Sequence, residues 1–383
     1  MTTRRNFLKT AGLVTLGSAL ISPSKLFAQS GSKPNSSGSN VMKLTWKTFD
    51  ARMKYAFTVA GSTRTTTQIV LTQITWNGYT GYGEAAMPPY LGETQASVVE
   101  FLKKVDLSRF KDPFMIEEIM LYIDSITTNN TAAKASVDIA LHDLVGQVFG
   151  QPWWKIWGFN PDNAPYTSYT IGLDTEDVVR HKTKEEAENF KVLKVKVGVD
   201  EKTDKMMINT IRSVAPDNTL YVDANQGWTD KYFALDMIHW LHEKKVVMAE
   251  QPMNKLRIDD IAWITERSPI PIIADESCQR LTDIPKLKGA FSGINIKLMK
   301  CTGLREAREM ITLANTFHMK LMVGCMTETS CAISAAAQLS PKVEWADLDG
   351  NFLIAEDQFD GVKVRDRGRL TLSDKPGIGV KPL

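Results

Sequence analysis

Five charged residues end successive short apolar segments in the second half of the chain. Three are carboxylates, Asp223, Glu250 and Asp275, and two are lysines, Lys196 before them and Lys297 after them. Successive members are separated by about 22 to 27 residues, the length of one strand, one helix and two loops. Because the carboxyl ends of parallel barrel strands meet on one face, we expect these side chains to converge on one pocket.

The three carboxylates predict a metal site. Convergent acids would repel one another and would be costly to bury without a cation between them. Oxygen ligands suit a hard divalent cation such as Mg²⁺, with positions left for substrate and water. The alternative is that Asp223, Glu250 and Asp275 only cap the helices that follow, since acids favour helix N-termini. Capping, however, would not require lysines on the same rim.

The lysines predict proton transfer. Lys194 lies two residues before Lys196, so both face the same side of their strand. Repulsion among Lys194, Lys196 and Lys297, together with a nearby cation, would lower their pKa values toward that of a usable base. The alternative is that these lysines form structural ion pairs with the carboxylates.

The elements that must hold these residues form an α/β chain of two domains. Residues 41–160 begin with β-branched strands and continue with helical periodicity, which predicts a separate α+β domain. Residues 161–350 alternate strands with amphipathic helices. Segments at 166–171, 321–325 and 345–349 complete eight strands, so we predict a (β/α) TIM-like barrel. Residues 351–383 form a C-terminal tail.

The first forty residues indicate export. Arg4 and Arg5 precede an apolar run over residues 11–21, which is too short to span a bilayer. This pattern resembles a twin-arginine signal over residues 1–28, followed by a flexible linker over residues 29–40. We therefore expect a periplasmic protein without a stable membrane anchor. The alternative is a disordered basic tail on a cytoplasmic protein.

Composition narrows the class of protein further. The 383 residues are 43% hydrophobic and carry a net charge of +2, so no electrostatic argument favours a nucleic-acid partner. Four cysteines are too few for a disulfide scaffold and lack the spacing of a zinc site, which predicts buried free thiols. A homo-oligomer is compatible with the sequence.

Lys-x-Lys, then Asp, Glu and Asp on the next three strands and Lys on the sixth, resembles the enolase superfamily in its muconate-lactonising subgroup. Residues 81–85, 138–158 and 376–380 resemble the subgroup's capping sheet, the helix leading into its barrel and its tail. The resemblance implies a barrel with an N-terminal cap completed by the tail. It also implies Mg²⁺ and an enediolate, with Lys196 and Lys297 as acid/bases on opposite faces and Lys194 lowering the pKa of Lys196. None of the five histidines is placed for a histidine-dependent racemase.

The last strand and one cap loop predict the substrate. Asp347 and Asp349 lie on one side of an extended segment, where they would complement a free α-ammonium, and the resemblance here is to dipeptide epimerases. The alternative is that Asp349-Gly350 is only a turn. Arg64, the only cation in residues 58–67, would pair with an acidic substrate side chain, unless it is a solvated surface residue.

Three functions remain open. The first is Mg²⁺-dependent epimerisation at the α-carbon of the C-terminal residue of a dipeptide such as L-Ala-D/L-Glu from murein peptides. The second is cycloisomerisation, or a β-elimination similar to that of o-succinylbenzoate synthase, whose anionic substrates Asp347 and Asp349 disfavour. The third is a barrel glycosidase, which leaves the lysines unexplained. A peptide- or sugar-binding protein without turnover is also compatible with the sequence.

Overall fold

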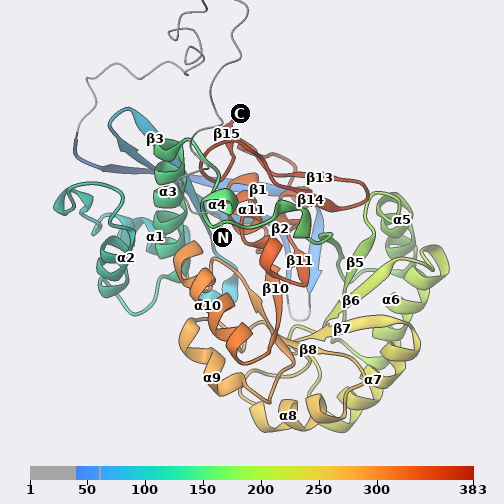
Figure 1. Cartoon of the computed structure of the whole chain (residues 1–383). Helices are drawn as coiled ribbons and strands as arrows, with labels where there is room; N and C mark the ends of the chain where they lie inside the picture. The colour runs from blue at the N-terminus through green and yellow to red at the C-terminus, as the bar shows by residue number, and fades with distance from the viewer. Residues whose placement is uncertain (1–39, 60–61) are drawn as a thin grey trace, which may run out of the picture. The chain divides into compact units, whose positions relative to one another are not determined.

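The computed structural model describes residues 40–59 and 62–383 (Figure 1). The predicted twin-arginine signal, and all but the last residue of the predicted linker, lie outside these residues. Within the described part of the chain, no helix is both long and apolar enough to cross a membrane.

The N-terminal part is an antiparallel sheet covered by helices. Its strands are β1 (Lys43–Val59), β2 (Ser62–Trp76) and β3 (Tyr79–Ala86), paired in that order. The helices α1 (Gln95–Leu102), α2 (Ile116–Ser125) and α3 (Thr131–Phe149) follow. Most of α3 is buried, and a Cβ on Gly83 of β3 would lie 2.0 Å from its Ser136 carbonyl oxygen. Glycine therefore allows the sheet and α3 to approach closely.

The barrel consists of eight parallel strands, as the sequence predicts. They are β4 (Ser168–Ile171), β5 (Val192–Lys196), β6 (Thr219–Asp223), β7 (Val246–Glu250), β8 (Ile272–Ala274), β9 (Gly293–Ile296), β10 (Lys320–Gly324) and β11 (Trp345–Asp347). A parallel bridge between Thr167 and Ala346 joins the first strand to the last.

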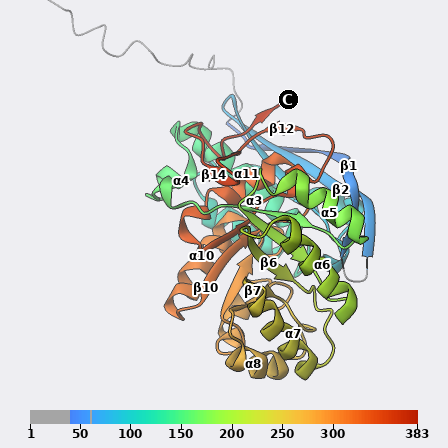
Figure 2. The same ribbon diagram turned by 90° about the vertical axis from the view of Figure 1, so that its right-hand side faces the viewer.

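Helices alternate with the strands and surround the barrel (Figures 1 and 2). A short helix, α4 (Trp153–Ile156), precedes β4. The barrel helices are α5 (Glu176–Glu186), α6 (Glu201–Val214), α7 (Lys231–Glu243), α8 (Ile258–Arg267), α9 (Ile284–Leu287), α10 (Leu304–Thr316) and α11 (Ser330–Ala337).

An apolar layer inside the barrel supports the predicted site. Several members of this layer stand two positions before a predicted site residue, so both face the barrel interior. Buried Val192 thus precedes Lys194, and buried Tyr221 precedes Asp223. The other buried members are Met248, Ile273 and Met322. The polar residues consequently form the next layer toward the carboxyl ends of the strands.

The C-terminal tail returns to the cap, as predicted. It contains β12 (Phe359–Asp360), β13 (Lys363–Arg365), β14 (Arg369–Thr371) and β15 (Lys381–Pro382). The Ile378 N–H donates to an Asp143 carboxylate oxygen of α3 at 2.9 Å, and the rings of Tyr82 and Phe359 meet edge to face.

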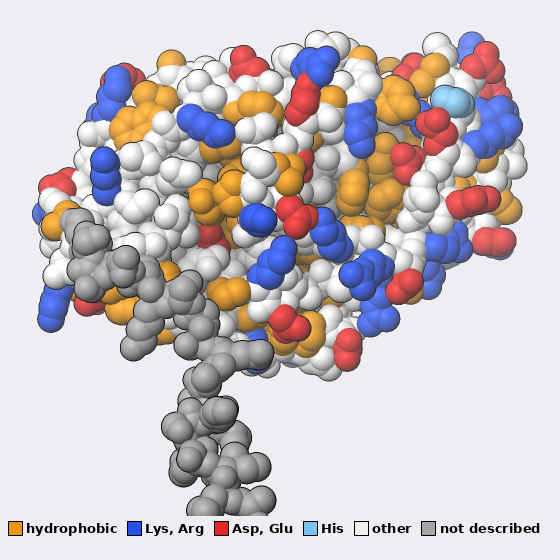
Figure 3. Space-filling view, turned by 90° about the horizontal axis from the view of Figure 1, so that it is seen from above, with side chains coloured by type: hydrophobic (Ala, Val, Ile, Leu, Met, Phe, Trp, Pro, Cys, Tyr) orange, Lys and Arg blue, Asp and Glu red, His pale blue; other side chains and the backbone are white. Residues whose placement is uncertain are grey.

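The surface and the cysteines agree with the composition. On the face shown in Figure 3, basic and acidic side chains are interspersed. All four cysteines are buried and free, as predicted.

Candidate active site

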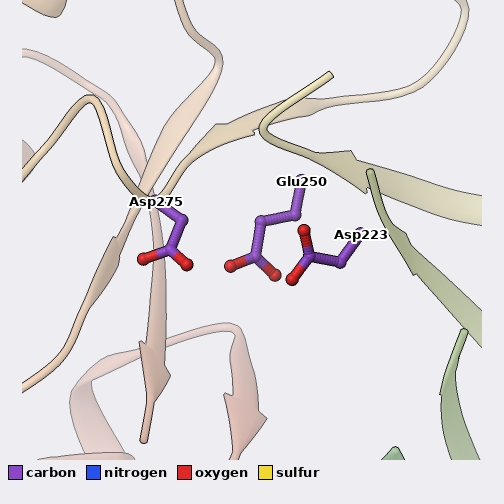
Figure 4. Close-up of side chains that lie close together, drawn as sticks. All are labelled: Asp223, Glu250 and Asp275. Carbon is purple, nitrogen blue, oxygen red and sulfur yellow. The ribbon is translucent and has the colours of Figure 1, made fainter. Parts of the chain in front are cut away.

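The structure brings the three predicted carboxylates together. Asp223 and Glu250 end β6 and β7, and Asp275 directly follows β8. One oxygen from each lies within 4.8 Å of the others, and all three side chains are buried. Figure 4 shows Glu250 between the other two. A buried set of three carboxylate oxygens fits Mg²⁺ by the chemistry of its donors.

The three predicted lysines contact this triad. Lys196 Nζ lies 2.7 Å from Asp223 Oδ2, and Lys297 Nζ lies 2.8 Å from Asp275 Oδ2. Lys194 Nζ lies 2.7 Å from Glu250 Oε2 and 3.1 Å from Asp223 Oδ2. Lys196 and Lys297 therefore pair with the two outer carboxylates of the triad.

The surrounding acids act against the predicted lowering of the lysine pKa values, which also depends on the bound cation and stays a prediction. Burial lowers the pKa of Lys194, but the charges of Asp347, Glu250 and Asp223 outweigh burial and hold that pKa well above its usual range. At Lys297, burial also lowers the pKa, and the attraction of Asp275 outweighs both burial and the repulsion from Lys194. All three lysines are ion-paired with acids here, and their role in proton transfer stays a prediction.

Asp223 and Glu250 of the triad differ in basicity. Burial raises the pKa of Asp223, but Lys196 and Lys194 outweigh it and bring the value to about 2. Burial and the charge of Asp223 raise the pKa of Glu250 to about 7. The network therefore distributes its negative charge unevenly, and Glu250 is the easier of these two acids to protonate.

Asp347 and Asp349 lie together at the end of β11, and both are buried. Asp347 Oδ2 lies 2.7 Å from Lys194 Nζ, and its other oxygen accepts from the Ser168 hydroxyl at 2.7 Å. Asp349 accepts from the Thr170 N–H at 2.6 Å and makes no capping bond to the 3₁₀ turn that follows it. Burial and the charge of Asp347 raise the pKa of Asp349 to about 7. Asp349 is therefore more than a turn residue.

Arg64 reaches from the cap to the barrel. It lies on β2, and its guanidinium donates to the Thr327 hydroxyl at 2.7 Å, in the loop after β10. Its side chain is part-buried, and burial lowers its pKa. The alternative of a fully solvated Arg64 is therefore wrong.

Sequence reasoning missed residues that support the ligands. Lys300 Nζ lies 2.6 Å from Asp275 Oδ1 and donates to the Asn295 carbonyl at 2.9 Å. The Asn295 amide donates to Glu250 Oε1 at 2.7 Å. Asn295 stands two positions before Lys297, so strand alternation could have placed it in the site. Lys300 follows the strand, and no periodic signal marks it.

A (β/α) barrel that carries three convergent carboxylates flanked by lysines defines a class of metal-dependent enzymes. Comparison with known families makes the assignment specific. Residues 43–158 match the N-terminal domain of the mandelate racemase / muconate lactonizing enzyme family, and residues 178–383 match the enolase C-terminal domain-like family. The chain therefore belongs to the enolase superfamily, which confirms the resemblance inferred from its motifs.

Individual relatives place the chain within this family. It is 58% identical to the L-Ala-D/L-Glu epimerase of Bacteroides thetaiotaomicron over 99% of both chains. It is 34% identical to the hydrophobic dipeptide epimerase of Enterococcus faecalis over 86% of this chain and 96% of that one. The dipeptide epimerase of Enterococcus faecalis in complex with Mg and L-Leu-L-Tyr superimposes with a TM-score of 0.82 at 32% identity, covering 89% of this chain and 99% of that one. The chain is a member of the dipeptide epimerases, which are isomerases.

Proposed function

We propose that the protein epimerises the α-carbon of the C-terminal residue of a dipeptide, with Mg²⁺ held by Asp223, Glu250 and Asp275. One lysine removes the α-proton and a second lysine returns a proton to the opposite face. L-Ala-D/L-Glu is the proposed substrate, because the relative that is 58% identical to this chain acts on it. The observation that carries the mechanism is the pairing of Lys196 and Lys297 with the two outer carboxylates.

The chemistry follows from these positions. An α-proton beside a carboxylate is hard to remove because the product is an enediolate dianion, and bound Mg²⁺ would neutralise that developing charge. One lysine, as the neutral amine, takes the proton from one face of the substrate. The other, as the ammonium, donates a proton to the opposite face. Lys196 and Lys297 then exchange these roles for the reverse reaction, and the configuration is inverted.

The far end of the substrate would meet Asp347 and Asp349. Lys194 contacts both Glu250 and Asp347, so the metal triad and this second pair of acids are separated by a single ammonium group. Two extended residues span roughly 7 Å, which suits a dipeptide lying from one to the other. Arg64, which contacts Thr327 across the cap and barrel, would pair with the acidic side chain.

The alternative functions receive less support. Muconate-type cycloisomerisation and o-succinylbenzoate synthesis use anionic substrates, which the buried acids Asp347 and Asp349 would repel. A glycosidase gives no role to the lysines and is not supported by the family assignment. We also propose a periplasmic, murein-derived dipeptide, on the basis of the twin-arginine pattern in residues 1–28.

The two-lysine mechanism is tested by α-deuterium exchange in D₂O with Mg²⁺, followed by NMR on each epimer of L-Ala-Glu. Lys297→Ala and Lys196→Ala should each stop net epimerisation, because a proton must leave on one side and return on the other. Each variant should still exchange one epimer, and the two variants should show opposite preferences. Lys202→Ala, at an exposed helix position, is the matched control. If either active-site variant exchanges both epimers at comparable rates, a single mobile base replaces this mechanism.

A further inference from the structure

Among the buried acceptor oxygens near the metal triad that have no hydrogen-bond donor in the described part of the chain, two belong to residues within two positions of a ligand. They are Oε2 of Glu276 and Oδ1 of Asn225. Glu276 directly follows Asp275 and is 5% exposed, and Asn225 stands two residues after Asp223. Buried acceptors without a donor are rare in folded proteins because they lose their contact with water without replacement.

The two side chains face each other. The Asn225 Nδ2 group donates to Glu276 Oε1 at 3.4 Å, a long contact that leaves Asn225 Oδ1 and Glu276 Oε2 without a donor. The Asn225 backbone N–H donates to Asp223 Oδ1 at 2.9 Å. Asn225 and Glu276 are therefore linked both to each other and to the ligand set.

The surrounding backbone holds this pair in place. Asn225 and the neighbouring Gln226 have φ values of 43° and 70°, a left-handed conformation that is costly except where surrounding contacts impose it. Gln226 N–H donates to the Gln251 carbonyl at 2.9 Å. The Gln251 side-chain oxygen accepts from the N–H groups on both sides of Glu276, those of Asp275 at 3.0 Å and Ser277 at 3.1 Å. Gln251 thus connects the loops that carry the two acceptors.

We infer that Asn225 and Glu276 form an acceptor pair that holds water ligands of the bound Mg²⁺ and thereby tightens its binding. Mg²⁺ keeps several water molecules when proteins bind it, and these waters are strong donors that lack protein partners. Glu276 is not one of the three carboxylates whose oxygens lie close enough to share an ion directly. Its role is therefore to orient the hydrated ion, as partners of metal ligands do in other sites. This inference rests on the proposed Mg²⁺ site.

The test measures metal affinity without turnover. Chelator-treated protein is titrated with Mg²⁺ by isothermal calorimetry at pH 8. Glu276→Gln removes charge and acceptor strength at constant shape. Asn225→Gly removes an acceptor without changing charge and tolerates the positive φ. Each should weaken Mg²⁺ binding about 10- to 100-fold.

A surface variant and a stability measurement distinguish water-mediated metal binding from general charge and from a structural role. Glu243→Gln, an exposed acid at the end of α7, should leave Mg²⁺ affinity unchanged. The metal-free melting temperature of both site variants should match that of the wild type, since neither loses a short hydrogen bond of the fold. If Asn225→Gly binds Mg²⁺ with wild-type affinity, any effect of Glu276→Gln comes only from the loss of a negative charge, and the proposed acceptor pair is refuted. A lower metal-free melting temperature would show a structural role instead. If the wild type itself binds no Mg²⁺, the proposed function fails rather than this inference alone.

Discussion

Replacing Asp349 with Asn should weaken recognition of the free N-terminus of the dipeptide. Asp349 is 2% exposed and accepts from the Thr170 N–H, a bond that an Asn side-chain oxygen can also accept, so the fold should persist. Substituting Asp347 would be a less specific test, because Asp347 Oδ2 also pairs with Lys194 Nζ at 2.7 Å. The substitution Asp349→Asn therefore removes one charge while disturbing little else.

The magnitude follows from one charge-assisted hydrogen bond to the substrate ammonium, which contributes about 1.5 to 3 kcal/mol. At about 1.4 kcal/mol per factor of ten, kcat/KM for L-Ala-L-Glu should fall roughly 10- to 150-fold. N-acetyl-L-Ala-L-Glu lacks the ammonium and should lose much less. The assay compares kcat/KM for both substrates by the change in optical activity, with Asp374→Asn as an exposed control.

The same preference should depend on pH. Because the pKa of Asp349 is raised to about 7, its carboxylate is protonated below that pH and ionised above it. In the wild type, the preference for the free amine over the acetylated substrate should therefore increase as pH rises through about 7. Asp349→Asn should abolish that increase. An equal loss for both substrates at every pH would refute the reasoning and leave Asp349 a structural residue.

Three further outcomes are expected. Excess chelator should abolish turnover and added Mg²⁺ should restore it, and activity that survives chelation would contradict the metal assignment. Asp223→Asn should lose metal affinity without unfolding, because the residue lies on the catalytic face of the barrel. Arg64→Met should raise KM for L-Ala-L-Glu at least about tenfold through the loss of one charged hydrogen bond, and should leave L-Ala-L-Leu nearly unchanged; parallel losses would show that the residue only joins cap to barrel. Gly83→Ala should lower the free energy of unfolding by at least about 1 to 3 kcal/mol, measured in urea, because its Cβ would lie 2.0 Å from the Ser136 oxygen; wild-type stability would show that α3 can shift.

The ligand set could be predicted from sequence because it depends on local rules. Asp223, Glu250 and Asp275 each follow a short apolar strand, and parallel strands of a barrel place such positions on one face. Lys194 and Lys196 share a side by strand alternation alone. Neither inference requires knowledge of which strands lie next to each other.

The pairing of charges could not be predicted in the same way. Lys194 and Asp347 are 153 positions apart and meet inside the closed barrel, where β4 lies between their strands, β5 and β11. Repulsion between lysines and pairing with acids were both compatible with the sequence, whereas in the folded site each lysine lies against nearby acids. The effect of those acids on the Lys194 and Lys297 pKa values depends on these distances, which the sequence does not supply. Asn225 and Glu276 escaped notice because an unsatisfied acceptor is visible only once its surroundings are known.

The barrel and the cap contribute different residues to the proposed site. The barrel strands carry the triad and the lysines, to which the proposed function assigns the proton transfer. Three cap residues contact the barrel loop after β10: Arg64 donates to the Thr327 hydroxyl, Tyr90 to the Met326 sulfur, and Glu84 accepts from the Thr329 N–H.

Because this loop follows a strand of the barrel, changes in the cap can move the wall of the substrate pocket without touching the triad. Substitutions at Arg64 should therefore alter which dipeptide is used, whereas substitutions at Lys196 or Lys297 should alter whether any dipeptide is epimerised. Under the proposed function, the cap thus sets the choice of substrate while the lysines of the barrel transfer the proton.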